Sequence, residues 1–179
     1  MIKILINLDI PICWTAPSGM IIEQKYIGVK KNETSICINY KRRKFVLRIS
    51  TEKIAKIKSI NAIAPNIIHS MDASYLMKII NILKKSNKNI LSIHDCFIIH
   101  PNDTQLLIST LITEFILMYT SSKFINEFHR QCLDQISLRY EIDDKYIYIN
   151  DEQIEIPENP FKENREFYIN MENANYMLL

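Results

Sequence analysis

Hydrophobic residues alternate with polar ones in the first third of the chain, a pattern typical of strands. The alternation covers residues 24–29 and 35–40, and residues 45–49 repeat it beyond a Lys-Arg stretch that predicts a turn. Ahead of it, the apolar residues 2–8 predict a short helix or strand, and a proline-punctuated loop follows as far as Gly19. The chain is therefore expected to open with a β-rich region.

Helical spacing of apolar residues dominates the remainder. It predicts a helix over residues 73–85, ended by a polar loop that reaches Asn89. Asp103 is expected to cap a long helix that runs through Tyr119, and residues 123–139 form a second amphipathic helix. The order helix, strand-turn-strand, helix predicts an α+β fold in which helices pack behind an antiparallel hairpin.

The candidate chemistry lies in the run from Leu91 to His100, where His94 and Asp95 interrupt an otherwise apolar stretch. A carboxylate between two apolar strands carries a desolvation cost unless a positive partner compensates it. A hairpin would lift Asp95 to its tip, where the carboxylate could hold Mg²⁺ with an open water side. The other interpretation is ordinary: a satisfied histidine beside an exposed turn aspartate.

A second block, residues 64–77, contains His69 and Asp72. Pro65 stands in its approach, Ser70 and Asp72 are candidate N-caps, and an apolar run of helical spacing follows. The block therefore predicts a helix entry, with two polar side chains near its start.

Four segments together carry a family resemblance. Residues 65–74, Pro-Asn-Ile-Ile-His-Ser-Met-Asp-Ala-Ser, and residues 93–97, Ile-His-Asp-Cys-Phe, resemble the C-terminal palm and fingers region of single-subunit, bacteriophage-type RNA polymerases, a family that includes mitochondrial and fungal-plasmid enzymes. Residues 11–19 are similar to its Trp-Thr-x-Pro-x-Gly segment, and residues 156–160 to its closing segment. The resemblance covers the chain from about Pro11 to Leu179.

The resemblance implies template-directed ribonucleotidyl transfer, in which a 3′-hydroxyl attacks the α-phosphate and pyrophosphate leaves. Two Mg²⁺ ions held by two aspartates would serve this reaction, and Asp95 matches one of those aspartates. His94 matches the motif histidine, with a role in shaping the turn or a purely structural one. His69 and Asp72 match groups that line the nucleic acid near the active site, and Asp72 as a plain N-cap is an equal alternative. DNA template, RNA transcript and ribonucleoside triphosphates are the implied partners.

Departures from the family pattern set further expectations. Cys96 stands where the family usually has serine, and Ile98 where it has glycine, a change that removes backbone freedom beside the site. The other metal-binding aspartate and the nucleotide-selecting helix should lie upstream of Pro11, where only ten residues are present. Residues 1–179 are therefore expected to form a single C-terminal polymerase segment that is inactive alone and needs the remainder of the polymerase.

Charge indicates a candidate phosphate contact, and composition indicates where in the cell the product is expected. The net charge is only +2, but Lys41, Arg42, Arg43 and Lys44 form a basic cluster, for which phosphate contact and a solvated face are the two interpretations. The four dispersed cysteines indicate neither a zinc site nor a disulfide framework. The chain is not expected to enter a membrane. Abundant Ile, Asn and Lys fit AT-rich coding DNA, so a mitochondrial product encoded in the organelle or on a plasmid is expected.

Three interpretations of the whole chain follow. The first is the C-terminal part of an RNA polymerase, as a split subunit or a truncated reading frame. The second is a fragment of a related DNA polymerase, whose palm also carries a His-Asp turn. The third is a remnant that binds nucleic acid without catalysis.

Overall fold

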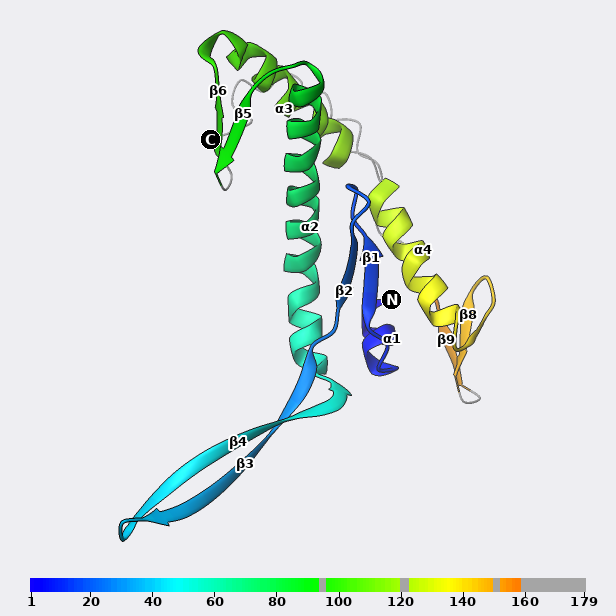
Figure 1. Ribbon diagram of the computed structural model, residues 1–179. Helices are drawn as coiled ribbons and strands as arrows, with labels where there is room; N and C mark the ends of the chain where they lie inside the picture. The colour runs from blue at the N-terminus through cyan, green and yellow to red at the C-terminus, as the bar shows by residue number, and fades with distance from the viewer. Residues whose placement is uncertain (94–95, 120–122, 150–151, 159–179) are drawn as a thin grey trace. The chain divides into compact units, whose positions relative to one another are not determined.

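The computed structural model describes residues 1–93, 96–119, 123–149 and 152–158 (Figure 1). Its helices are α1 (Ile2–Asn7), α2 (Lys56–Lys85), the 3₁₀ turn η1 (Pro101–Asp103), α3 (Thr104–Tyr119) and α4 (Lys123–Ser137). Its strands are β1 (Ile12–Thr15), β2 (Ile21–Gln24), β3 (Ile27–Ile38), β4 (Lys41–Ile54), β5 (Ile90–Ile93), β6 (Cys96–Ile99), β7 (Glu141–Ile142), β8 (Tyr146–Ile149) and β9 (Glu152–Glu155). The strands form small sheets, β1-β2, β3-β4, β5-β6 and β7-β8-β9, and the last three are antiparallel throughout.

Two compact units divide the described residues. The first combines Met1–Trp14, Glu23–Asn66 and Cys132–Ile156, and the second combines Thr15–Ile22, Ile67–Gln131 and residues 157–158. The mixture of helices and small antiparallel sheets agrees with the predicted α+β class.

The first unit contains a long two-stranded ribbon formed by β3 and β4 (Figure 1). Its turn falls at Asn39 and Tyr40, whose φ values of 50° and 59° are those of a type I′ turn. The ribbon's register shifts once, between Ile27 and Val29. Gly28 stands at this bulge because a Cβ there would lie 2.8 Å from the Thr51 hydroxyl. The ribbon departs from the prediction in two ways: residues 27–38 are one strand, and the Lys-Arg stretch lies in β4 rather than in the turn.

The rest of the first unit supplies its buried residues. Leu5 and Ile6 of α1, Ile12 and Trp14 of β1, and Ile147 of β8 are almost fully buried. The helix predicted as one alternative for residues 2–8 is confirmed. The proline-rich loop is wrong in part, because residues 12–15 form β1. The apolar Ile12 and Trp14 alternate with half-buried neighbours there, which is the strand period.

The second unit is built on an antiparallel pair of helices, the C-terminal half of α2 and the whole of α3. Ile79 and Leu83 of α2 form a buried cluster with Leu107 and Leu111 of α3. Tyr75 packs on the same cluster and makes an edge contact with Phe115. The salt bridge from Lys88 to Asp103, at 2.7 Å, lies where the chain leaves α2 and enters α3. Asp103 directly precedes α3, as predicted.

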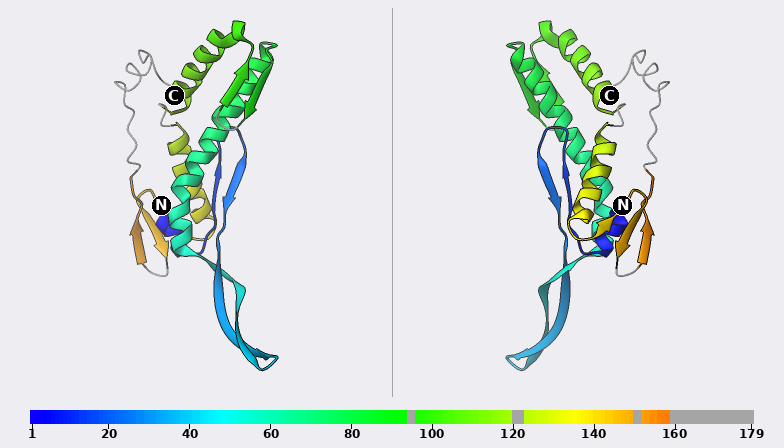
Figure 2. Two further views of the ribbon diagram at one scale, coloured as in Figure 1. Left: turned by 90° about the vertical axis from the view of Figure 1, so that its left-hand side faces the viewer. Right: turned by 90° about the vertical axis from the view of Figure 1, so that its right-hand side faces the viewer.

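The β5-β6 hairpin lies beside this helix pair (Figures 1 and 2). Ile90, Phe97 and Ile99 pack one face of the hairpin on the α2-α3 cluster. The strands pair antiparallel from Ile90↔Ile99 to Ile93↔Cys96. The predicted pair of strands and its packing on helices are therefore found in the described residues, 90–93 and 96–99.

Helix α2 begins 17 residues earlier than predicted, at Lys56 rather than Ala73. Pro65 lies inside it, although proline removes one backbone hydrogen bond from a helix. Ser70 is likewise interior, and its hydroxyl donates a 2.7 Å hydrogen bond to the carbonyl of Ile67. Ser70 and Asp72 are therefore not N-caps, and the prediction of a helix entry at this block was wrong. Among the described residues, no helix is both long and apolar enough to cross a bilayer.

Candidate functional site

The predicted catalytic pair, His94 and Asp95, lies outside the described residues. What the structure does describe is the pair of strands that flank it, which end at Ile93 and begin again at Cys96. The assignment of Asp95 as a Mg²⁺ ligand therefore stays a prediction, as does the role of His94.

The hairpin is apolar on both faces. Leu91, Ile93 and Ile98 belong to the face that does not pack on the helices, and each is more than half exposed. Cys96 shares that face and is also exposed. Ile98, the residue that departs from the family pattern, lies directly opposite Leu91. The Leu91 and Ile98 side chains therefore stand side by side on the exposed face of the strands that flank residues 94–95.

His69 and Asp72 lie one turn apart on α2, and both side chains are exposed. The Tyr119 phenol donates a 2.5 Å hydrogen bond to Oδ1 of Asp72. This contact crosses from α3 to α2 inside the second unit. The structure thus gives Asp72 a definite partner, which the sequence pattern did not indicate.

The Trp-Thr-x-Pro-x-Gly segment contacts the same helix. The backbone N–H of Ser18 donates a 3.2 Å hydrogen bond to the hydroxyl of Ser74, which is fully buried. The Ser74 hydroxyl in turn donates to the carbonyl of Ser70, at 2.7 Å. Two of the segments that resemble the polymerase family are therefore in direct contact, although more than fifty residues separate them in the chain.

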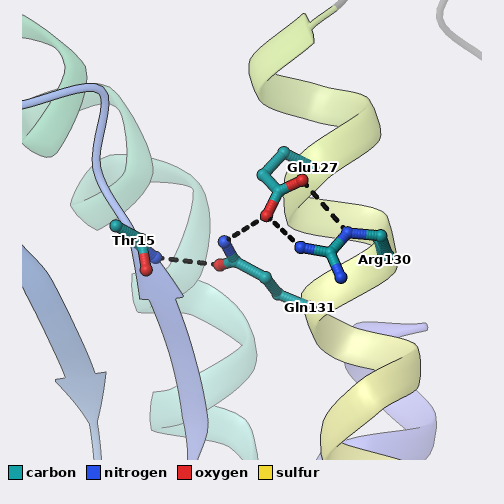
Figure 3. A network of polar contacts seen from close by, with 4 residues as sticks. All are labelled: Thr15, Glu127, Arg130 and Gln131. Carbon is teal, nitrogen blue, oxygen red and sulfur yellow. Dashed lines mark hydrogen bonds and ion pairs between the residues drawn. The ribbon is translucent and has the colours of Figure 1, made fainter. Parts of the chain in front are cut away.

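A polar network fixes the strand that leads into this segment (Figure 3). The Thr15 N–H donates to the side-chain oxygen of Gln131, at 2.9 Å, and the Gln131 amide donates to Glu127, also at 2.9 Å. Arg130 forms two hydrogen bonds to the same carboxylate. The hydrogen bonds from Arg130, and next those from Gln131, lower the pKa of Glu127. The network borders a cavity of about 460 Å³.

One turn further along α4, Gln135 repeats this arrangement within the first unit. Its side-chain oxygen accepts from the Cys13 N–H, at 2.9 Å, and its amide donates to the Cys13 carbonyl, at 2.6 Å. Gln131 and Gln135 are four residues apart and so lie on one face of α4. Both side chains bond backbone groups of β1, and sequence periodicity contains no signal for such pairing.

Asn66, next to Pro65, contacts the base of the ribbon in the first unit. Its amide nitrogen lies 2.8 Å from Oε1 of Gln24 and 3.2 Å from the Tyr26 hydroxyl. Gln24 is buried, and its own amide donates to the carbonyl of Ser59, at 2.9 Å. Asn66 therefore has a structural role here that its position in the block did not reveal.

The basic cluster lies on β4, at the exposed end of the ribbon. Cross-strand partners share a face of a ribbon, and successive residues alternate between faces. Arg42 and Lys44 pair with Cys37 and Ser35, and Arg48 pairs with Lys31. The four cations Lys31, Arg42, Lys44 and Arg48 therefore form one side, which we call the basic face. Glu33 is the acidic residue on that side.

Lys41 and Arg43 lie on the opposite side of the ribbon, which we call the apolar face. It also contains a third cation, Lys30, and the apolar residues Ile36, Ile38, Phe45, Leu47 and Ile49. All five of these apolar side chains are exposed. The four residues that the sequence presents as one cluster are thus divided equally between two faces with different chemistry.

Metal-binding groups are scarce in the part of the chain that the structure describes. No set of three or more His, Cys, Asp or Glu side chains there is arranged to hold a metal ion. Asp72 is engaged by Tyr119, and Asp103 by Lys88. The described side chains therefore do not complete a Mg²⁺ site by themselves.

Comparison with known proteins identifies the family. The family model described as DNA-dependent RNA polymerase matches residues 4–174. The chain therefore belongs to the DNA-dependent RNA polymerase family, as the four segments predicted.

Individual relatives agree with this assignment. A probable DNA-directed RNA polymerase of Neurospora crassa is 38% identical over 143 residues, which are 78% of this chain and 16% of the relative. One from Podospora anserina is 33% identical over 66% of this chain and 13% of its own length. DNA-directed RNA polymerase 2, chloroplastic/mitochondrial, of Nicotiana sylvestris is 30% identical over 65% of this chain and 11% of its own length. The chain thus spans less than a fifth of the length of these relatives.

Proposed function

We propose that the chain forms the C-terminal palm and fingers part of a DNA-directed RNA polymerase and supplies Asp95 to its nucleotidyl-transfer site. The observation that carries the proposal is the family match over residues 4–174, combined with an antiparallel hairpin whose strands end on either side of His94 and Asp95. DNA template, RNA transcript and ribonucleoside triphosphates are the proposed partners. The relatives are named as RNA polymerases, which leaves the DNA polymerase interpretation without support.

The proposed metal chemistry needs a second carboxylate. When bound, Mg²⁺ would neutralise charge on the reacting phosphates and activate the attacking hydroxyl. Asp95 is the residue of this chain assigned to it, and the rest of the polymerase is proposed to supply the other aspartate. The 179-residue chain by itself is therefore proposed to be inactive.

We assign the remaining site residues to nucleic-acid contact. His69 and Asp72 are exposed on one side of α2, in the block that the family places along the nucleic acid. For the ribbon, the sequence pattern nominated Lys41, Arg42, Arg43 and Lys44 together. A phosphate backbone meets one face of a ribbon at a time, so we place the contact on the basic face, with Lys41 and Arg43 outside it.

A mitochondrial location is proposed with the function. Relatives in Nicotiana and Arabidopsis are named as chloroplastic/mitochondrial or mitochondrial polymerases. The compositional bias toward Ile, Asn and Lys is consistent with an organellar or plasmid gene.

The test is template-dependent incorporation of ribonucleotides by the polymerase isolated from its source through an affinity tag on this chain. We expect activity that Asp95→Asn abolishes, and no activity from the purified 179-residue chain. Asp144→Asn, which removes an exposed carboxylate from the loop between β7 and β8, is the matched control and should leave incorporation unchanged. Activity that survives Asp95→Asn would contradict the proposal, and incorporation of deoxyribonucleotides alone would restore the DNA polymerase interpretation. Nucleic-acid binding without incorporation would support the non-catalytic remnant.

A further inference from the structure

The contact between Tyr119 and Asp72 is short and specific. The phenol oxygen lies 2.5 Å from Oδ1 of Asp72, the distance of a charge-assisted O–H···O⁻ hydrogen bond. Asp72 is exposed, so its carboxylate would otherwise exchange among rotamers in water. The bond therefore selects one orientation of a side chain that would not be held by packing.

The phenol is itself held in place. Its ring lies 4.5 Å from that of Phe115, and it makes an edge contact with Tyr75 at 6.5 Å. The Tyr75 ring is fixed by its packing on the α2-α3 cluster, while its hydroxyl donates a 2.8 Å hydrogen bond to the carbonyl of Leu111, away from Tyr119. The rings of Phe115 and Tyr75 thus support the Tyr119 ring by packing, in a geometry typical of aromatic pairs, and Tyr75→Phe would keep this packing.

The protonation state favours the same arrangement. Burial raises the pKa of Tyr119, and the hydrogen bond to Asp72 raises it further. The phenol therefore remains a hydrogen-bond donor across the whole physiological pH range.

We propose that Tyr119 is a positioning residue of the polymerase, which orients the Asp72 carboxylate on the side of α2 that also carries His69. The inference rests on the proposed function. Tyr119 occupies Oδ1 and leaves Oδ2 as the oxygen that accepts from a ligand. A carboxylate oxygen accepts hydrogen bonds, so a neutral donor of the nucleic acid, a sugar hydroxyl or a base amine, is the ligand of matching chemistry.

The experiment compares two changes of the same kind in the polymerase isolated through the tagged chain. Tyr119→Phe removes the hydroxyl that bonds Asp72, and Tyr75→Phe removes a hydroxyl of the same cluster that bonds a backbone carbonyl. We expect Tyr119→Phe to lower kcat for ribonucleotide incorporation about tenfold with little change in KM for the nucleotide, since a misplaced side chain costs rate rather than substrate affinity. Tyr75→Phe should keep the wild-type kcat.

Melting temperatures and a double variant distinguish a positioning role of Tyr119 from a merely structural one. The two variants should have similar melting temperatures, because each loses one hydroxyl from the same cluster. Asp72→Asn should lower kcat to a similar extent, and adding Tyr119→Phe to it should cause no further loss. Asp72→Asn changes an exposed side chain, so it carries the test if Tyr119→Phe does not fold.

Different results would overturn the positioning role of Tyr119 and the proposed function. Equal kcat values for the Tyr119→Phe and Tyr75→Phe enzymes, or additive losses in the double variant, would overturn the positioning role while the wild-type activity still supports the proposed function. Failure of the wild-type enzyme to incorporate ribonucleotides would instead overturn the proposed function, and this inference with it.

Discussion

The backbone amide of Ser18 donates its hydrogen bond to the hydroxyl of Ser74, and the hydroxyls of these two residues are also 3.2 Å apart. Ser18 belongs to the turn after β1 and Ser74 to the middle of α2. Ser74 is fully buried and bonds the Ser70 carbonyl as well. One small side chain therefore satisfies polar groups from two segments that carry the family resemblance.

Replacing Ser74 by alanine should destabilise the chain by about 1 kcal/mol, because the fully buried Ser74 hydroxyl is lost together with its hydrogen bond from the Ser18 amide. Denaturant unfolding of the purified chain measures the change. Ser86→Ala is the control: this hydroxyl also bonds a carbonyl four residues earlier, at 3.1 Å, but it is exposed. Equal losses for the two variants would show that the buried contact with Ser18 has no special weight.

The division of the ribbon into two faces predicts unequal effects of equal charge changes. Arg42→Ala with Lys44→Ala should reduce the slope of log K against log salt for nucleic-acid binding by about two, one for each lost phosphate contact. Lys41→Ala with Arg43→Ala removes the same charge from the apolar face and should change the slope much less. Lys84→Ala with Lys85→Ala, at the exposed end of α2, tests the effect of net charge alone. If all three pairs behave alike, binding follows overall charge and not the basic face.

Stability should fall at high pH because of the aromatic cluster. Burial, and next the nearby Glu114, raise the pKa of Tyr75 to about 12. A folded-state pKa above the ordinary value of 10 means that the folded chain binds more protons than the unfolded chain in this window. The stabilisation is complete below pH 10 and is lost as the pH rises toward 12. Unfolding measured between pH 9 and 12 should show a shallower decline for Tyr75→Phe, and an unchanged slope would refute the assignment.

The four cysteines should differ sharply in reactivity. Cys132 is fully buried, and burial raises its pKa to about 12, so very little thiolate forms at pH 8. Cys37 and Cys96 are exposed. Brief treatment with iodoacetamide followed by peptide mass spectrometry should therefore label Cys37 and Cys96 and leave Cys132 unmodified. Labelling in guanidinium chloride, where all four should react, is the control, and modification of Cys132 under native conditions would contradict its burial.

Sequence periodicity predicted the elements in which apolar and polar residues follow one regular period. The helices 104–119 and 123–137 and the strands on either side of His94 and Asp95 were found close to their predicted bounds, because each shows the period of its own secondary structure. The start of α2 was missed because Pro65, Ser70 and Asp72 are all usual near helix ends. In α2, Asn66 and Ser74 form hydrogen bonds to residues far away in the chain, Gln24 and Ser18. A local sequence pattern does not reveal such contacts.

The sequence predicted some residues of the candidate site and missed others. Motif resemblance selected His69 and Asp72 but not Tyr119, because the phenol comes from another helix and has no distinctive neighbours in the sequence. The basic residues 41–44 were recognised by composition. Their separation onto two faces follows from their place in β4, which begins at Lys41 because the turn falls earlier, at Asn39 and Tyr40. The left-handed backbone of that turn is unusual for tyrosine.

The pairing of the ribbon makes its surface sensitive to insertions and deletions in a way that its composition is not. A point substitution in β4 that replaces one cation by another leaves the basic face basic and the apolar face apolar. A single residue gained or lost between the turn and Arg48 would instead move every later side chain to the other side, so that lysines and arginines would take the places of isoleucine and phenylalanine. In this part of a polymerase gene, indels of one codon should therefore be far rarer among functional descendants than changes of residue type.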